Sequence, residues 1–573
     1  MTYLRNLIFL LILTLIATNT LFGQHNYVPL DRAYTNHLID RLEMKSDTLS
    51  EQIHTSHRPY SRKSVAGMID KIENDIMASY ESGSIIFSDP QDRVQRYYLL
   101  KDNLDWTDKG KLFSNFKKFK PLYKYKGSLL LVDKKDFVLS INPILNFEVA
   151  KETDNDDLLF KNTRGLELRG IISDKLAFHT TITENQARHP KYVQNYIFNS
   201  YLSLPFQNRF AAFRDNGVDY FNATGYISFQ PIKNIDLTFG HDKHFFGNGY
   251  RSLFLSDFSG NYPFLKINTK LWKFEYTNLF TEFISQFKGN EGNVYGYADG
   301  ERIRKYSAMH HLSLNITRKL NIGIFESIIF SRGNGYEINY LNPIIFYRSI
   351  ENQIGGTDNV LLGFDFKWKA FKNSLFYGQL LLDEWRFSAI IENNGDWRNK
   401  NGFQLGFKTV DLLGVHSLDV QLEYNQVRPY TYSHSDTISN FTHYNQPLAH
   451  PLGANFRELV GIVNYQTRFK VNASLKTMVA QIGTDIGDLN YGNNLFLGYN
   501  TRFQDFNNDL LQGNKNDLFL SNLVVSYNFW HNMFFDLSYT FRENLSDDNS
   551  LDYKSHTFSA GLRVNIGRSD YLF

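Results

Sequence analysis

The 573-residue sequence contains no cysteine and almost nothing that could form a membrane-spanning helix. The absence of cysteine excludes disulfides, thiolate metal sites, a cysteine nucleophile and a lipid anchor attached to cysteine. Mean hydropathy is -0.37, so a bundle of membrane helices, each needing about 20 apolar residues, is excluded as well. Charge of one sign is not in excess either, since 61 Lys and Arg oppose 59 Asp and Glu. We therefore expect no nucleic acid partner.

The one strongly apolar run, Leu7 to Ala17, is too short to cross a bilayer. It follows Arg5 and precedes a short stretch of small and polar residues. This layout is typical of a secretory signal. We predict a signal peptide over residues 1–23, with cleavage before Gln24.

Aromatic residues, in contrast, are abundant: 35 Tyr and 49 Phe help to bring the aromatic fraction to 16%. Many lie in segments where apolar and polar side chains alternate. Between residues 557 and 567, for example, Phe558 and Leu562 alternate with Ser559 and Arg563. Successive side chains of a strand point to opposite faces, and a membrane barrel turns the apolar ones toward lipid. The pattern predicts an all-β transmembrane barrel with aromatic girdles at its two membrane interfaces.

The lengths of the connections predict about eighteen antiparallel strands, because bacterial barrels have short periplasmic turns and longer outer loops. A first strand over Phe137 to Val149 and a last one over Ser555 to Gly567 bracket eight hairpins. Gly127 to Asp133 could add a strand, Leu495 to Phe503 could be a hairpin within an outer loop, and Pro143 predicts a bulge. The eight short connections lie near Asp174, Lys233, Leu271, Arg318, Lys372, Leu413, Phe469 and His531.

Residues 24–125 have a different pattern and predict a small α-helical periplasmic segment with a connector, ahead of a barrel over residues 126–573. Ser61 is a suitable N-cap for a helix with apolar residues at three- and four-residue spacing, and Asp89 before Pro90 starts another. We expect these helices to pack on the periplasmic mouth, although a solvated linker is an alternative. We expect the terminal Phe573 at the periplasmic end of the closing strand.

Several patterns with possible chemistry have simpler interpretations. His241 and His244 flank Asp242, but on a strand end they point to opposite faces, so we predict no metal site. Gly247-Asn248-Gly249 lacks the Lys-Ser or Lys-Thr of a phosphate loop and predicts a turn. The carboxylates at 383 and 384 could suggest glycoside hydrolysis, but we predict no catalytic residue and no cofactor.

The long outer loops contain the aromatic and amide side chains that pyranose rings require. One group lies in the loop after residue 383, where girdle packing is the alternative to sugar binding: Trp385, Arg386 and Trp397. A second group lies in the loop from Arg428 to Asn455, which could instead fold inward and plug the barrel. Its candidates are Tyr430, Tyr432, His443, Tyr444, Asn445, Gln446 and His450.

Two stretches resemble the Wzi-like capsule-assembly family of outer-membrane proteins, and within it the branch associated with gliding motility and surface polysaccharide. One runs from residue 445 to 455 as Asn-Gln-Pro-Leu-Ala-His-Pro-Leu-Gly-Ala-Asn. The other runs from residue 241 to 252 and contains His241, Asp242, His244, Gly247, Asn248, Gly249 and Arg251. The resemblance implies an eighteen-stranded barrel with a periplasmic helical bundle, acting as a surface lectin.

We predict the first of three functions that the sequence allows. The first is a non-enzymatic outer-membrane barrel that binds or anchors surface or capsular polysaccharide, with membrane lipid and polysaccharide as partners. The second is a structural component of a gliding-motility or secretion machine, with periplasmic or outer-membrane export components as partners. The third is a diffusion porin, because an eighteen-stranded barrel is wide enough for a channel.

Overall fold

The structure is a computed structural model that describes residues 25–81, 89–107, 122–153, 155–173, 175–288, 301–333, 335–344, 346–356, 358–383, 394–549 and 551–573. The predicted signal peptide therefore lies outside the described residues. None of the described helices is long and apolar enough to cross a membrane.

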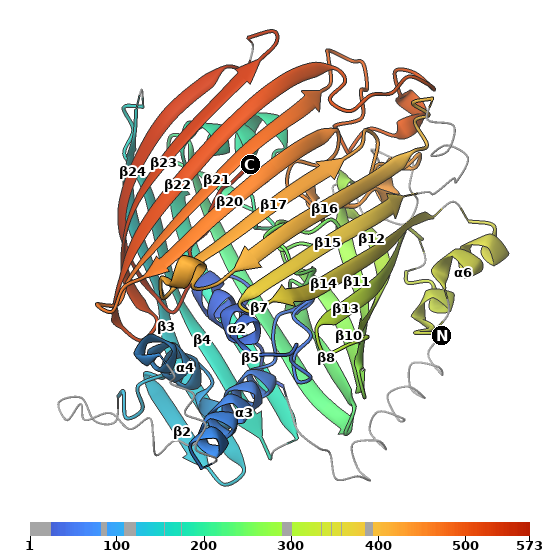
Figure 1. Cartoon of the computed structure of the whole chain (residues 1–573). Helices are drawn as coiled ribbons and strands as arrows, with labels where there is room; N and C mark the ends of the chain where they lie inside the picture. Colours follow the sequence, from blue (N-terminus) through green and yellow to red (C-terminus); the bar gives the residue numbers. More distant parts are fainter. Residues whose placement is uncertain are drawn as a thin grey trace.

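The described residues form a closed antiparallel barrel of eighteen strands, as predicted (Figure 1). Each strand pairs with its neighbours along the chain, and β24 closes the barrel against β3. The barrel strands are β3 (Phe137–Glu152), β4 (Leu159–Ile172), β5 (Leu176–Arg188), β7 (Gly217–Ile232), β8 (Ile235–Asp242), β10 (Tyr262–Leu271), β11 (Phe274–Lys288), β12 (Arg302–Asn315), β13 (Leu320–Phe330), β14 (Asn359–Phe371), β15 (Ser374–Asp383), β16 (Lys400–Thr409), β17 (Leu418–Val427), β20 (Phe456–Gln466), β21 (Val471–Thr484), β22 (Asn514–Trp530), β23 (Met533–Ser546) and β24 (Tyr553–Val564).

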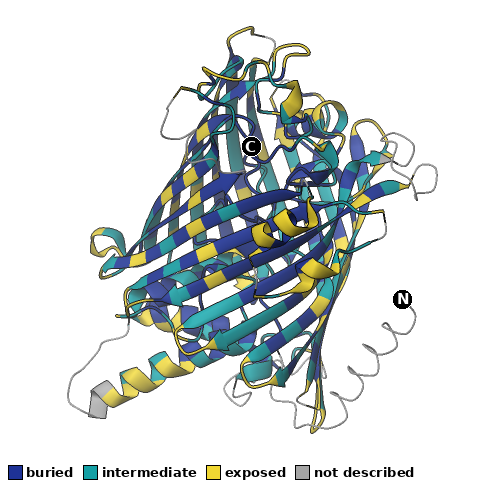
Figure 2. Ribbon diagram, turned by 90° about the vertical axis from the view of Figure 1, so that its right-hand side faces the viewer, coloured by how far each residue is buried: buried dark blue, intermediate teal, exposed yellow. Residues whose placement is uncertain are grey.

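The predicted alternation of side chains holds along the wall, as the alternating exposure in Figure 2 shows. On β22, for instance, Leu523 and Tyr527 are exposed on the outside, whereas Asn522 and Ser526 are buried in the lumen. The apolar side chains thus face lipid and the polar ones face inward. All eight predicted short connections join neighbouring strands at one end of the barrel, which is therefore the periplasmic end.

Two details differ from the prediction, whereas the possible strand within residues 127–133 is present. Pro143 pairs with Leu166 without a shift of register, so the predicted bulge is wrong. The proline is tolerated because it falls where β3 changes its other partner, from β2 (Leu130–Lys134) to β24. That short strand lies in the segment 127–133 but adds only a local hairpin. The segment 495–503 holds the 3-10 helix η7 (Tyr499–Thr501) instead of a hairpin.

The N-terminal helices close the periplasmic mouth. We call residues 25–81 and 89–107 the periplasmic plug; its helices are α2 (Ala33–Lys45), α3 (Arg62–Glu81), α4 (Pro90–Asp102) and the 3-10 turn η1 (Leu104–Trp106). The predicted caps are present, since Ser61 Oγ accepts from Ser64 N (3.3 Å) and Asp89 Oδ1 accepts from Gln91 N (2.6 Å). The helices share an apolar core that includes Ile39, Val65 and Leu99. In Figure 1, α2 lies among the strands and α3 lies at the lower end of the barrel.

The last nine residues contradict the expectation for Phe573. The closing strand β24 ends at Val564, and the chain then turns into the lumen (Figure 1). Phe573 lies against Tyr196 and Phe258, with ring centroids 5.0 and 5.6 Å away, in the large apolar cluster inside the barrel. A strand ending at Phe573 would have paired along the wall; instead the aromatic end of the chain is covered by other aromatic rings.

The remaining elements belong to loops and short pairings. They are β1 (His57–Arg58), β6 (Ala211–Phe213), β9 (Phe245–Phe246), β18 (Thr442–His443), β19 (Gln446–Pro447), α5 (Lys191–Asn195), the π-helical turn η3 (Tyr196–Ser200), η4 (Ile338–Leu341), α6 (Tyr347–Ile354), η5 (Leu412–Gly414) and η6 (Thr437–Ser439).

Candidate functional site

The segment that resembles the family motif folds into the lumen and joins the two ends of the barrel interior. Its short strand β9 pairs with β1 of the periplasmic plug, with Phe246 opposite His57. Gly247 N donates to the Ser56 carbonyl (2.8 Å), and Phe246 N donates to the Leu255 carbonyl (3.0 Å). This motif therefore has a structural role, because it connects the outer loops to the N-terminal helices.

The motif side chains contact the lumen in separate places rather than converging on one ligand. Asn248 Oδ1 accepts from Thr55 Oγ1 (3.1 Å), and His241 Nδ1 lies 3.2 Å from the Ala223 carbonyl. The backbone N of His244 donates to the Tyr262 hydroxyl (3.0 Å). Asp242 Oδ1 accepts from Lys243 N (2.9 Å), in its own turn. Among the described residues, no group of three or more His, Asp or Glu could hold a metal ion.

Two further motif residues are fixed by close contacts. Arg251 Nη2 donates to Glu458 Oε1 (2.9 Å) and to the carbonyl of Leu572 (2.6 Å) in the C-terminal tail. A Cβ atom at Gly249 would lie 2.6 Å from the backbone carbonyl oxygen of Arg251, so only glycine fits at this point. Arg251 thus ties the motif to the wall and to the tail at once.

The loop from 428 to 455 also folds inward, and most of its predicted sugar-binding side chains are buried. Tyr430 donates to the Asn490 carbonyl (3.0 Å) and Tyr432 to the Leu253 carbonyl (2.8 Å). His450 Nε2 lies 2.7 Å from Glu458 Oε2. The plugging alternative for this loop therefore agrees with the structure, because these polar atoms are hydrogen-bonded internally.

His443 and the residues after it attach this loop to its neighbours. The two ring nitrogens of His443 lie 3.0 Å from Ile284 N and 3.0 Å from the Asn261 carbonyl. Burial lowers the pKa of this imidazole to about 3, so it is neutral at physiological pH.

The amides of the same loop contact the connection between β5 and β7. Asn445 Nδ2 donates to the Tyr201 carbonyl (3.0 Å), and Gln446 Nε2 donates to the Gln207 carbonyl (2.6 Å). Ser203 Oγ donates to the Tyr444 carbonyl (2.7 Å). We call residues 189–210, 243–261 and 428–455 the outer plug, because they fill the outer half of the lumen together.

One predicted residue, Trp397, lies on the outer face. Its indole packs on Tyr499, with ring centroids 4.6 Å apart, and the Arg502 guanidinium lies 4.5 Å from the indole ring. Trp397 N donates to the Asp505 carbonyl (3.0 Å), which fixes its loop to the loop between β21 and β22. We call Trp397, Tyr499 and Arg502 the outer aromatic cluster.

Tyr499 and Arg502 were not predicted as neighbours of Trp397, because they are far from it in the chain. The only available signal was the length of the loop between residues 484 and 517, which marks it as an outer loop but not as a neighbour of residue 397. Trp385 and Arg386 lie outside the described residues.

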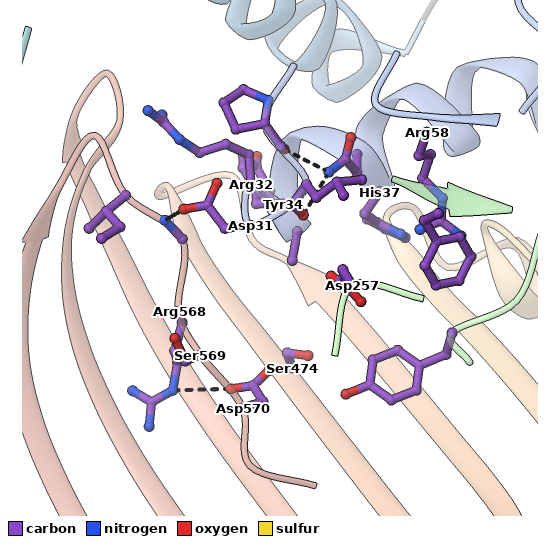
Figure 3. Close-up of a pocket in the computed structure, with 18 of the residues that line it drawn as sticks. Asp31, Arg32, Tyr34, His37, Arg58, Asp257, Ser474, Arg568, Ser569 and Asp570 are labelled. Carbon is purple, nitrogen blue, oxygen red and sulfur yellow. Dashed lines mark hydrogen bonds and ion pairs between the residues drawn. The ribbon is translucent and has the colours of Figure 1, made fainter. Parts of the chain in front are cut away.

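Between the two plugs and the wall remains a cavity of about 490 Å³ (Figure 3). Residues of both charge signs line it, including Asp31 and Arg58 from the periplasmic plug and Arg568 from the C-terminal tail. Asp31 Oδ2 accepts from Gly567 N (2.9 Å), and Arg568 Nε lies 3.4 Å from Asp570 Oδ1.

The fold defines an outer-membrane β-barrel whose lumen is filled from both ends by its own chain. Residues 160–549 match the family model described as capsule assembly protein Wzi, so the chain belongs to the Wzi capsule-assembly family. No curated protein matches the sequence.

Solved structures of other outer-membrane barrels are similar in fold. Wzi of Escherichia coli, described as a carbohydrate-binding barrel involved in group 1 capsule assembly, has 14% identity and a TM-score of 0.57, with 95% of this chain and 100% of that chain covered. OprD of Pseudomonas aeruginosa has 10% identity and a TM-score of 0.39, with 74% and 94% covered. The first likeness supports the fold; the second is too low to support an argument.

Proposed function

We propose that this protein binds surface or capsular polysaccharide at the outer face of the outer membrane and holds it there without catalysis. The observation that carries the proposal is the outer aromatic cluster, set on loops that are fixed to each other and to the outer plug. Membership of a capsule-assembly family, and the carbohydrate binding described for the Escherichia coli protein, support the same function.

The outer aromatic cluster has the chemistry that a sugar ring needs. Trp397 is half-buried, and Phe503 and Phe506, which follow Tyr499 closely in the sequence, are exposed. Arg502 supplies hydrogen-bond donors. Asn508 N donates to the Gly395 carbonyl (2.8 Å), so the two loops are held together at Gly395 as well as at Trp397. A preformed aromatic surface binds a flexible glycan at a lower cost in entropy.

The other predicted sugar-binding residues have one of two roles in this proposal: they extend the binding surface or support it. Trp385 and Arg386 belong to the same connection as Trp397, and we propose that they extend the binding surface. We propose that the residues of the loop 428–455, most of which are buried, support the surface from below: Tyr430, Tyr432, His443, Tyr444, Asn445, Gln446 and His450.

The test is binding of the purified full-length barrel to polysaccharide from the surface of its own cells. We expect Trp397→Ala to weaken binding about tenfold, which corresponds to about 1.4 kcal/mol. Phe346→Ala is the matched control, because Phe346 is an exposed aromatic in a different outer connection. Equal binding by wild type and Trp397→Ala, or no binding by wild type, would contradict the proposal.

A second function concerns the periplasmic side. We propose that α3 is a docking surface for a periplasmic component of an export or gliding-motility machine, reached after residues 1–23 direct export. The observation is that α3 lies at the lower end of the barrel (Figure 1) and exposes Asp70, Lys71, Asp75 and Met77. Cross-linking from residue 75 in cells should capture a periplasmic protein, and cross-linking from exposed Lys515 at the outer end should not; equal patterns would contradict docking.

A further inference from the structure

An apolar notch of about 590 Å³ lies on the lipid-facing side of the wall, at the seam where β24 meets β3. Four neighbouring strands and the connection between β3 and β4 line the notch. The strands contribute Val149 and Lys151 (β3), Phe558 and Ala560 (β24), Leu537 and Tyr539 (β23), and Leu523 and Val525 (β22), and the connection contributes Leu158.

The strand register explains why the wall is hollow here. One row across the strands pairs Val149 with Ala560, Ala560 with Leu537, and Leu537 with Val525. Ala560 is the one small side chain in this row, so the wall is recessed between large neighbours. The next row toward the outer end contains Phe558 and Tyr539, whose rings are 4.8 Å apart and form one side of the notch.

The positively charged side chain of Lys151 lies at the outer end of the notch. Lys151 pairs with Phe558 in the register and is the second-last residue of β3, whose end lies on the long-loop side of the barrel. Its Nζ donates to the Asp156 carbonyl (3.0 Å) and is exposed. Nearby, Tyr539 and His556 share a hydrogen bond of 2.7 Å. Basic residues at a membrane interface bind lipid phosphates, and hydroxyl and imidazole groups suit sugar hydroxyls.

We propose that this notch binds one acyl chain of a phosphorylated glycolipid of the outer leaflet, with a phosphate of its headgroup on Lys151. Charge complementarity favours a phosphorylated lipid over a neutral one. The position of Lys151 at the outer end of its strand favours the outer leaflet, and the Tyr539–His556 pair favours a sugar headgroup over ethanolamine. This binding is independent of polysaccharide capture by the outer aromatic cluster, which lies on different strands and loops.

The test uses the full-length, delipidated protein in detergent, with lipid binding measured by native mass spectrometry. The probes are diphosphoryl lipid A, monophosphoryl lipid A and phosphatidylethanolamine. We expect one tightly bound diphosphoryl lipid A, weaker binding of the monophosphoryl form, and the weakest binding of phosphatidylethanolamine. Binding of phosphatidylethanolamine as tight as that of diphosphoryl lipid A would overturn the proposal.

Variants locate the site. Ala560→Leu fills the notch and should lower affinity for diphosphoryl lipid A about tenfold, while Lys151→Gln should lower it about threefold and reduce the preference over the monophosphoryl form. Leu312→Phe on β12 and Lys554→Gln on β24 are controls, since both side chains are exposed on the barrel exterior but do not line the notch. If Ala560→Leu does not fold, Ala560→Val replaces it. Unchanged affinity in the folded notch variant would overturn the proposal.

Discussion

The two plugs close the same lumen by different chemistry. The periplasmic plug is held to the wall by buried ion pairs, such as Lys367 Nζ with Glu43 Oε2 (3.0 Å) and Lys408 Nζ with Asp40 Oδ2 (2.8 Å). Within the outer plug the contacts are mainly between neutral groups, such as the carbonyl contacts of Gln446 and Tyr432, while Arg251 pairs with Glu458 of the wall (2.9 Å). Ion pairs fix position by charge and depend on both partners, whereas amides and rings depend on close packing.

The largest effect is expected at Arg41 of the periplasmic plug. This fully buried guanidinium contacts Asp92 (3.2 Å), Asp411 and Asp419. Arg41→Ala leaves carboxylates buried without their partner and should destabilise the plug by about 3–5 kcal/mol. Hydrogen exchange of α2 should rise strongly, with Arg93→Ala as the control because Arg93 is exposed on α4. Unchanged exchange of α2 would show that the ion pairs do not hold the plug.

Phe573 tests the contribution of packing to the outer plug. Phe573→Ala removes a ring from contact with Tyr192, Tyr196 and Phe258 and should cost about 3 kcal/mol. Increased proteolysis of the outer loops, with an unchanged barrel, is the expected readout. Phe346→Ala, at an exposed aromatic in a different outer connection, serves as the control; equal proteolysis in the two variants would contradict a role for the tail.

Gln446 gives a smaller effect. Gln446→Ala removes the donor to the Gln207 carbonyl and one of the two acceptors of Phe206 N, which keeps its bond to the Phe258 carbonyl. The change should cost about 1–3 kcal/mol. The rate of hydrogen exchange in residues 201–207 should rise by the factor that corresponds to this loss of free energy. Asn199→Ala, at an exposed position, should leave the rate unchanged. The comparison of the plugs predicts that this change leaves α2 unaffected.

The smallest effect is a difference in pH dependence between two contacts. Burial opposes ionisation of Asp411, but its contacts with Lys45 and Arg41 lower its pKa to about 2. The ionised carboxylate therefore stabilises the folded protein fully above the ordinary pKa of about 3.9, and this contribution is lost as pH falls toward 2. His443, with a pKa lowered to about 3 by burial, prefers to be neutral, so its site loses stability as pH falls from about 6.5 toward 3.

Hydrogen exchange between pH 7 and 4 measures this difference. Residues 441–450 should become less protected in that range, and His443→Asn should reduce the slope. The backbone around Asp411 should keep its protection until the pH falls below about 4. Equal slopes in wild type and His443→Asn would show that the imidazole does not govern the outer plug.

The sequence predicted the wall well because its information is local. Alternation on each strand places Leu523 and Asn522 on opposite faces regardless of the rest of the chain, and turn positions such as His531 mark where the alternation restarts. Even the caps at Ser61 and Asp89 follow from neighbouring residues. These features need no knowledge of which strands meet.

The lumen could not be predicted in the same way. The inward path of the tail to Phe573, the pairing of His57 with Phe246, and the packing of Trp397 on Tyr499 join residues far apart in sequence. An aromatic or amide side chain has the same local signature whether it binds sugar outside or packs inside. Only barrel closure decides which polar groups find internal partners.

The sequence by itself therefore determined an eighteen-stranded membrane barrel, with its sides and its helical N-terminus, because period-two patterning and turn lengths are properties of short segments. The tertiary structure alone decided that the lumen is filled, that the family motif connects its two ends, and that Trp397 remains at the surface. The physical reason is that burial and hydrogen-bond satisfaction depend on contacts between distant segments, which exist only once the barrel has closed.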